Sequence, residues 1–255
     1  CFVNIKEKYM RYNELTFQGR NAVLEAFRSG KTIDKLFILD GCQDGPIKSI
    51  VREAKKTDAI INYVDKERLD RLAGTGHHQG VVAIGAAYEY AEVDDILASA
   101  KEKGEDPFIF ILDEIEDPHN LGAIIRTANL AGAHGVIIPK RRAVGLTATV
   151  AKTSAGAINY TPVAKVTNIS QTIEELKKQG LWFVCADMGG ETMYNLNLKG
   201  PIGLVIGNEG NGVSRLVKDK CDFIASIPMK GDIDSLNASV AAGVLAYEIV
   251  RQRLN

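Results

Sequence analysis

Short runs of consecutive apolar residues recur along the chain, and segments with apolar residues at helical spacing separate them. The clearest run is Phe108–Leu112, which reads FIFIL. Such a run is typical of a strand that is buried on both faces of a parallel sheet. Two further runs, at 202–206 and 223–227, each lead into a loop rich in Gly, Asn, Ser and acidic residues. This alternation predicts a parallel α/β sheet from residue 108 to the C-terminus.

The remaining elements of this region follow from the same patterns. Strands are predicted at 135–139, 162–166 and 181–186, and helices at 121–132, 147–156, 169–179, 213–216 and from about Ser235 to 251. Asn120 is a good N-cap for the helix 121–132, and Arg126 lies opposite the apolar face of that helix. The usual rules for chain connections predict an unknotted, Rossmann-like order of strands.

The first third of the chain predicts a separate, smaller domain. Helices are predicted at 18–29, 46–56 and 66–73, and strands at 35–39, 59–64 and within 74–87. This order predicts a three-layer α/β domain over residues 14–90. The segment 91–106 carries six acidic and two basic residues and has apolar residues at helical spacing, so it is interpreted as a helix and acidic linker before a second domain, 107–255. Residues 1–13 are interpreted as a leader or added lead-in, because Met10 is placed like a natural start.

Composition places the chain among soluble globular proteins with one or two domains. It has 255 residues, of which 45% are hydrophobic and 25% charged, and it contains no run of 18 apolar residues that predicts a membrane span. The four cysteines lie far apart and are interpreted as reduced thiols of a cytoplasmic protein. The net charge of −1 does not predict nucleic-acid binding by bulk charge, so contacts with RNA depend on local patches such as residues 140–142.

Two polar loops follow the strands at 202–206 and 223–227. The first contains Gly207, Gly210 and Gly212, which allow a close approach of backbone to a ligand. Taken alone, such a loop is as often a plain turn. Its spacing fits neither the dinucleotide fingerprint nor the P-loop. Because ligands bind at the carboxyl ends of strands in α/β sheets, two neighbouring loops of matched polarity predict one pocket.

Three long motifs occur in a fixed order. They are DEIEDPHNLGAIIRTANLAGAHGVIIPKRRA from residue 113, IGLVIGNEGNGVSRLV from residue 202, and IPMKGDIDSLNASVAAGVLAYE from residue 227. Together they resemble the SpoU, or TrmH-like, branch of the SPOUT RNA methyltransferases. The resemblance implies a SPOUT domain with a deep trefoil knot, which the connection rules do not predict. It also implies a homodimer that transfers a methyl group from S-adenosylmethionine to a ribose 2′-hydroxyl of RNA.

The resemblance also implies which residues form the site. The cofactor-binding positions are Gly207, Ile227, Met229 and Leu236, and the catalytic positions are Asn120, Arg126, Glu209, Ser235 and Asn237. Since a guanidinium is effectively always protonated, Arg126 either grips a phosphate and polarises the hydroxyl or has a perturbed acidity as a base. Without the motifs, the simplest interpretation of Arg126 is a solvated surface residue. Glu209 would then be interpreted as a cap of the helix 213–216, and Ser235 as a plain N-cap.

The N-terminal segments GRNAVLEA and HHQGVVA are similar to two signatures of the ribosomal-protein-like RNA-binding domain found in some of these enzymes. RNA contacts are therefore expected at Arg20, His78, Gln79 and, in the second domain, Arg141. A mobile surface turn is the alternative for the His-Gln loop. Adjacent His77 and His78 cannot easily bind one ion, so no metal is expected.

The two-domain layout looks most similar to enzymes that methylate a guanosine ribose in bacterial 23S rRNA. Enzymes that act on tRNA or on other rRNA sites stay as alternatives within the family. A non-catalytic RNA-binding protein with this fold is the alternative from another class, although the polar loop residues are present. A nicotinamide dehydrogenase is disfavoured because its fingerprint is missing.

Overall fold

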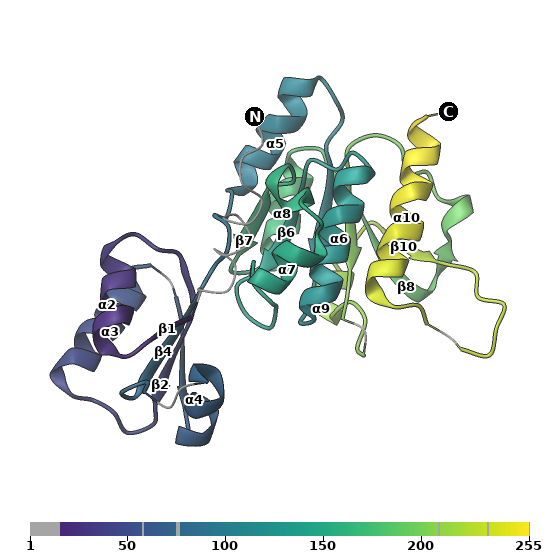
Figure 1. Ribbon diagram of the computed structural model, residues 1–255. Helices are drawn as coiled ribbons and strands as arrows, with labels where there is room; N and C mark the ends of the chain where they lie inside the picture. The colour runs from purple at the N-terminus through teal and green to yellow at the C-terminus, as the bar shows by residue number, and fades with distance from the viewer. Residues whose placement is uncertain (1–15, 58, 75–76, 209, 234, 255) are drawn as a thin grey trace. The chain divides into compact units, whose positions relative to one another are not determined.

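A computed structural model describes residues 16–57, 59–74, 77–208, 210–233 and 235–254 (Figure 1). The chain divides into two compact units. Unit 1 comprises Cys1–Glu89 with Gly145–Ala148, and unit 2 comprises Tyr90–Val144 with Thr149–Asn255. Each unit has its own sheet.

Unit 1 is built on a four-stranded sheet in the order β1-β4-β2-β3, in which only β2 and β3 are parallel. Its elements are β1 (Thr16–Gln18), α2 (Arg20–Arg28), β2 (Ile33–Leu39), α3 (Gly45–Lys56), β3 (Ile60–Val64), α4 (Lys66–Ala73) and β4 (Val81–Gly85). The first helix was predicted to start at residue 18, but residues 16–18 pair with β4 as a strand. The other elements agree with the predictions to within a few residues.

The alternation of side chains along β2 creates the three layers of unit 1. Leu36 and Ile38 are buried against α2 and α3, whereas Phe37 is buried against α4. Successive residues of a strand point to opposite faces, so a continuous apolar run covers both sides of the sheet. The three-layer prediction is confirmed.

Unit 2 contains six parallel strands in the order β10-β8-β9-β5-β6-β7. Its elements are α5 (Val93–Lys103), β5 (Phe108–Leu112), α6 (Pro118–Leu130), β6 (Gly135–Pro139), α7 (Ala148–Thr153), η2 (Ala157–Asn159), β7 (Val163–Val166), α8 (Ile169–Lys178), β8 (Trp182–Thr192), η3 (Met193–Asn195), β9 (Ile202–Ile206), α9 (Arg215–Lys218), β10 (Phe223–Ser226) and α10 (Ala238–Arg253). The predicted parallel α/β sheet is confirmed. The trefoil knot stays a prediction.

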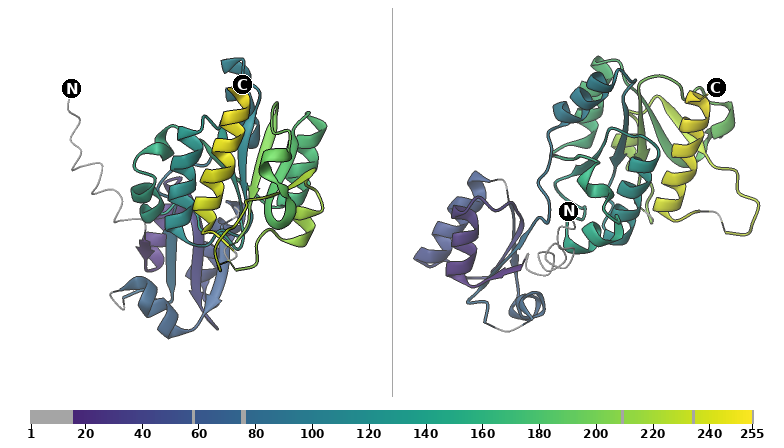
Figure 2. Two further views of the ribbon diagram at one scale, coloured as in Figure 1. Left: turned by 90° about the vertical axis from the view of Figure 1, so that its right-hand side faces the viewer. Right: turned by 45° about the horizontal axis from the view of Figure 1, so that its top comes forward.

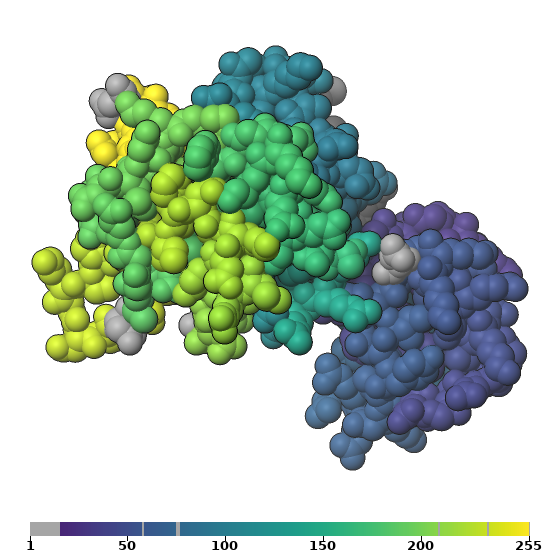
Figure 3. Space-filling view, turned by 180° about the vertical axis from the view of Figure 1, so that it is seen from behind, coloured from purple at the N-terminus to yellow at the C-terminus, as the bar shows by residue number. Residues whose placement is uncertain are grey.

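Helices cover both faces of this sheet. Helices α6 and α10 pack side by side on one face (Figures 1 and 2). Apolar residues of α5, α8 and α9 form one core with Ile109 and Ile111 of β5 on the other face, toward which Figure 3 looks. Phe108 and Phe110, on the opposite side of β5, are also fully buried. A strand covered on both sides explains why β5 reads as an uninterrupted apolar run.

Two helix starts differ from the predictions. Helix α6 starts earlier, at Pro118, and its N-cap is Asp117, whose carboxylate accepts a hydrogen bond of 2.8 Å from the His119 amide. Asn120 is therefore a buried residue of the first turn rather than the cap. Helix α10 has Asn237 as its N-cap, so Ser235 is not the cap either. At both helices more than one residue can serve as the N-cap, and the tertiary fold decides between them.

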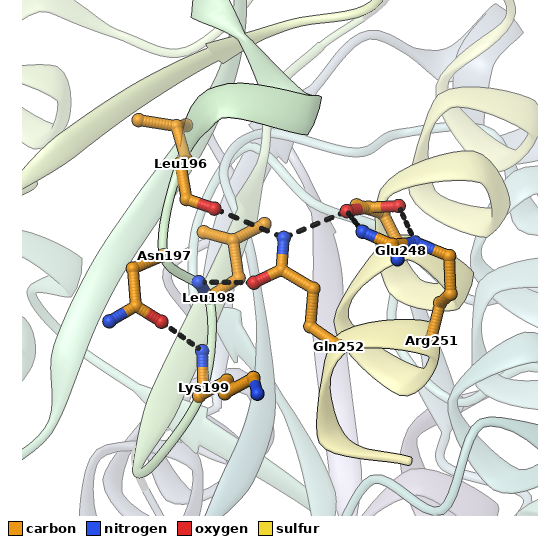
Figure 4. A network of polar contacts seen from close by, with 7 residues as sticks. All are labelled: Leu196, Asn197, Leu198, Lys199, Glu248, Arg251 and Gln252. Atoms are coloured by element: carbon orange, nitrogen blue, oxygen red, sulfur yellow. Dashed lines mark hydrogen bonds and ion pairs between the residues drawn. The ribbon is translucent and has the colours of Figure 1, made fainter. Parts of the chain in front are cut away.

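A polar network fixes the C-terminal end of α10 (Figure 4). The Gln252 side chain accepts a hydrogen bond of 2.8 Å from the Leu198 amide and donates to the Leu196 carbonyl at 3.0 Å and to Glu248 at 2.7 Å. Glu248 also pairs with Arg251, which lowers the pKa of its carboxyl. The structure buries Glu248 and pairs it within its own helix.

Replacing Gln252 with alanine should lower the free energy of unfolding by about 2–4 kcal/mol, since each buried polar group left unpaired costs about 1–3 kcal/mol. Urea denaturation followed by circular dichroism measures this change. Asn197→Ala is the matched control, because within the described part of the chain its exposed side chain bonds only the Lys199 amide, two residues away. Equal stability of the two variants would contradict a stabilising role for the Gln252 network.

His134 is buried at the opposite end of the sheet from the polar loops. Its Nδ1 accepts a hydrogen bond of 3.0 Å from the Phe108 amide, and its Nε2 lies 3.1 Å from a Glu105 oxygen. Burial, helped by Lys103, lowers the pKa of His134 despite the attraction of Glu105. The folded protein therefore holds a neutral imidazole that donates its Nε2 proton to Glu105.

This histidine should make the protein less stable in acid. Because its pKa is lower in the folded state than the ordinary value of 6.5, the unfolded chain takes up the proton first as the pH falls. Stability should therefore decrease below about pH 6.5, and His134→Gln should show a smaller decrease. Urea midpoints from pH 7.5 to 5.5 measure both. If the urea midpoints of the two proteins changed with pH in parallel, the assignment of a neutral imidazole to His134 would be contradicted.

Candidate active site

The carboxyl ends of β9 and β10, together with the middle of β8, which lies between them in the sheet, surround a pocket of about 360 Å³. The four positions that the motifs implied for the cofactor all line it, and they are Gly207, Ile227, Met229 and Leu236. Ser235 and the first turn of α10 also contribute to the wall. The prediction that the loops after β9 and β10 form one pocket is confirmed.

The loop after β9 folds back on itself, and this fold requires Gly207. A Cβ at Gly207 would lie 2.1 Å from the Gly212 carbonyl carbon and 2.2 Å from the Val213 nitrogen. Asn208 and Gly212 exchange two backbone hydrogen bonds, and Gly212 has a positive φ of 66°. At Gly207, backbone atoms alone therefore form the pocket wall, because a side chain there would collide with Gly212 and Val213.

The acidic loop after β5 supports the glycine-rich loop that follows β9, which is called the glycine loop below. Asp113 is buried, and its carboxylate accepts a hydrogen bond of 2.7 Å from the Ser214 amide. The Asn208 side chain donates to the Glu114 carbonyl at 3.0 Å and accepts from the Gly210 amide at 2.8 Å. These bonds fix the loop in the absence of secondary structure, so the pocket is largely preorganised.

Two asparagines connect α6 with α10 beside the pocket. Asn237 Nδ2 donates to Asn120 Oδ1 at 3.0 Å, while Asn237 Oδ1 accepts from the Ser239 amide at 2.9 Å and caps α10. Asn120 is buried, at 6% exposure. One side chain therefore ties the start of the pocket-lining helix to the first turn of α6.

Arg126 is exposed on α6, while its neighbours Ile124 and Ile125 are buried. The predicted polar placement of Arg126 is confirmed. Among the described residues, none forms an ion pair with Arg126, and Arg126 does not itself line the pocket. Glu209 lies outside the described residues. The structure thus groups Asn120, Asn237 and Ser235 around the start of α10 and leaves the Arg126 guanidinium facing solvent.

An irregular stretch of β8 supplies pocket residues that the sequence analysis missed. Cys185 pairs with Ile224, but the next pair joins Glu191 with Ala225, so residues 186–190 are displaced from the ladder. Asp187 and Met188 lie in this stretch and line the pocket. Hydrogen bonding from Lys218 lowers the pKa of Asp187, and Asp187 raises that of Lys218. A polar residue directly after the predicted strand 181–186 was the signal that was overlooked.

The residues of unit 1 that were expected to contact RNA form hydrogen bonds with other groups of unit 1. The Arg20 side chain donates to Asp44 at 2.5 Å and to the Gln79 carbonyl at 3.1 Å. His78 is only 5% exposed, and its ring nitrogens contact Asp70 and the Gly80 amide, each at 3.0 Å. Burial therefore argues against direct RNA contact by His78, which instead shapes the turn.

Arg20 and Gln79 keep exposed surface, so their RNA contacts stay predictions, as does that of Arg141, which is exposed after β6 in unit 2. The described part of the chain contains no group of three or more His, Cys, Asp or Glu residues suited to a metal. Within the same residues, no helix is long and apolar enough to cross a membrane.

Comparison with known proteins identifies the family. The profile of the SpoU rRNA Methylase family matches residues 107–247, and that of RNA 2′-O ribose methyltransferase substrate binding matches residues 18–91. The YacO protein of Bacillus subtilis, whose name places it in the TrmH family of tRNA/rRNA methyltransferases, is 53% identical over 92% of this chain and 94% of its own.

Solved structures agree in fold. The SpoU methyltransferase AviRb from Streptomyces viridochromogenes, in complex with AdoMet, has a TM-score of 0.61 at 23% identity and covers 97% of this chain and 98% of its own. An AdoMet-bound rRNA methyltransferase from Sinorhizobium meliloti has a TM-score of 0.59 at 23% identity, over 98% and 96% of the two chains. The chain therefore belongs to the SpoU family of RNA methyltransferases.

Proposed function

We propose that this protein transfers a methyl group from S-adenosylmethionine to a ribose 2′-hydroxyl, with a guanosine of 23S rRNA as the substrate. The observation that carries the proposal is the pocket in which Gly207, Ile227, Met229 and Leu236 come together. The match of unit 1 to a substrate-binding domain of 2′-O ribose methyltransferases supports the ribose as target.

The pocket fits the cofactor in size and chemistry. Its volume of about 360 Å³ lies within the range of roughly 300–1,000 Å³ that is usual for small-molecule sites. Ile227, Met229 and Leu236 offer an apolar surface for the adenine, and the glycine loop offers backbone groups to read its edge. Gly207 cannot carry a side chain without displacing Gly212, which explains a glycine at the cofactor wall.

S-Adenosylmethionine supplies an electrophilic methyl group on a sulfonium. A bond forms between the ribose oxygen and the methyl carbon, the sulfur–methyl bond breaks, and the hydroxyl proton leaves to a base. Arg126 grips the neighbouring phosphate and polarises the hydroxyl, which an always-protonated guanidinium does well. The exposure of Arg126 without an ion pair to the described residues leaves it available for RNA.

The residues around the start of α10 position this reaction. Asn237 and Asn120 hold the two helices in register, and Ser235 offers a neutral hydroxyl at the pocket wall. Glu209 orients Arg126 or accepts the proton. The second copy of a homodimer completes the RNA site. Exposed apolar side chains on the paired helices α6 and α10, such as Leu130 and Tyr247, support this assembly.

Methyl transfer from radiolabelled S-adenosylmethionine to separate RNAs tests the substrate. The RNAs are unmodified 23S rRNA, free and in assembling particles, 16S rRNA and bulk tRNA. We expect label on one guanosine of 23S rRNA. Label on tRNA or 16S rRNA would keep the chemistry and contradict the substrate. Bound cofactor without label on any RNA would favour the non-catalytic RNA-binding alternative.

A further inference from the structure

The displaced stretch of β8 brings one carboxylate to the cofactor pocket. Residues 186–190 leave the regular pairing with β10, and a Cβ at Gly190 would lie 2.2 Å from the Ile224 carbonyl oxygen. The chain can therefore follow this path only with glycine at position 190. Irregularities of this kind often lie beside active sites and redirect a side chain. Here the redirected side chain is Asp187, which lines the pocket.

Asp187 is held in place from two sides. One carboxylate oxygen accepts a hydrogen bond of 3.0 Å from the Gly189 amide, and the other pairs with Lys218 of α9. Its side chain is 25% exposed and lines the pocket, so Asp187 is not sealed off by these two contacts. Among the described residues that line the pocket, Asp187 is the only charged one. Each carboxylate oxygen has a second lone pair, so Asp187 can accept further hydrogen bonds.

We propose that Asp187 accepts hydrogen bonds from the ribose hydroxyls of the adenosyl cofactor and that Lys218 is the residue that positions it. This inference rests on the proposed function, because it concerns the same pocket. Elsewhere in the described lining, the polar side chains are neutral and belong to Asn208, Asn211 and Ser235. An adenosine has two adjacent hydroxyl donors, and a charged acceptor forms the stronger hydrogen bonds.

The cofactor also carries positive charges, and these attract a carboxylate that has a net charge. Lys218 already neutralises Asp187, so the pair has no net charge and offers little long-range attraction to a sulfonium or an ammonium. The Asp187 carboxylate can still accept hydrogen bonds while it pairs with Lys218, because accepting a hydrogen bond needs no net charge. The diol is therefore the part of the cofactor that this arrangement recognises.

Calorimetry with 5′-methylthioadenosine separates these possibilities, because this ligand keeps the ribose but has neither sulfonium nor ammonium. Asp187→Ala should weaken its binding by about tenfold, as expected for lost hydrogen bonds to a charged acceptor. The same substitution should leave the affinity for the 2′,3′-dideoxy analogue within about twofold. Asp219→Asn is the matched control, since its carboxylate is exposed and pairs only with Arg215 in the described structure. Asp187→Asn replaces the alanine variant if that variant does not fold.

Three results would overturn the inference: unchanged binding of methylthioadenosine, an equal loss for the dideoxy analogue, or a loss confined to S-adenosylmethionine. Lys218→Met should raise KM for S-adenosylmethionine with kcat unchanged, which a purely structural defect would not do. If the unaltered protein binds none of these ligands, the proposed function fails. If it binds them and Asp187 variants do not differ from it, only the present inference fails.

Discussion

Methyl transfer should fall by about 10²- to 10³-fold when Arg126 is replaced by alanine, the usual loss when one preorganised group that stabilises developing charge is removed. The guanidinium has no ion-pair partner among the described residues and faces solvent, so its removal breaks no ion pair that the structure describes. The thermal midpoint should therefore stay unchanged. Single-turnover rates with saturating cofactor and RNA measure the effect on chemistry.

Two further variants make this result interpretable. Arg126→Lys keeps the charge but not the planar fork that grips a phosphate, so it should recover only part of the rate. Lys178→Ala removes an exposed cation from α8 on the other face of the sheet and should leave the rate unchanged. Full activity of Arg126→Ala would show that another residue activates the hydroxyl.

The second large effect is expected at Gly207. An added methyl group there must displace backbone atoms of Gly212 and Val213, because the contacts would be 2.1 and 2.2 Å. Forced overpacking costs about 1–3 kcal/mol, so the Kd for S-adenosylmethionine should rise by about ten- to a hundredfold. Equilibrium binding by calorimetry measures it.

The loop after β10 provides the matched control for this substitution. Gly231 is exposed and does not line the pocket, a Cβ there would meet nothing within 4 Å, and the backbone has no positive φ. Gly231→Ala should therefore bind the cofactor within about threefold of the unaltered protein. Equal losses for Gly207→Ala and Gly231→Ala would mean that a general effect of replacing loop glycines, rather than the contact with Gly212, controls binding.

Strands of unit 2 were predictable because both of their faces are buried. Phe108–Leu112, Gly135–Pro139 and Ile202–Ile206 were each predicted with the bounds that the structure has. A strand covered by helices on both sides needs apolar residues throughout, so its ends are marked by the first polar residue or turn. The edge strand β1 has only three residues, too few to show a pattern.

Helix starts and the turn around His78 were less predictable for a different reason. Asp117 and Asn120 are both acceptable N-caps, and only the packing of α6 decides between them. His78 looked like an exposed loop residue, but Asp70, eight residues away in the chain, pairs with its ring. Such choices depend on contacts that a local pattern does not contain.

The motifs identified the pocket residues that lie in long polar loops, and they missed those supplied by an irregular strand. Gly207, Ile227, Met229 and Leu236 stand in or beside loops that look unsuited to packing. Asp187 follows an apolar strand just as those loops do, yet the ladder resumes at Glu191 and hides the interruption. The displaced pairing of β8 with β10 is a tertiary feature, which single-sequence periodicity does not encode.

The most direct test of the central claim is to identify the methylated nucleoside. The protein is incubated with methyl-deuterated S-adenosylmethionine and unmodified 23S rRNA, the RNA is digested to nucleosides, and the products are analysed by mass spectrometry. The account predicts that the label appears on the ribose, as a 2′-O-methylnucleoside, and disappears with Arg126→Ala. Label on a nucleobase would contradict the proposed chemistry while leaving the cofactor pocket in place.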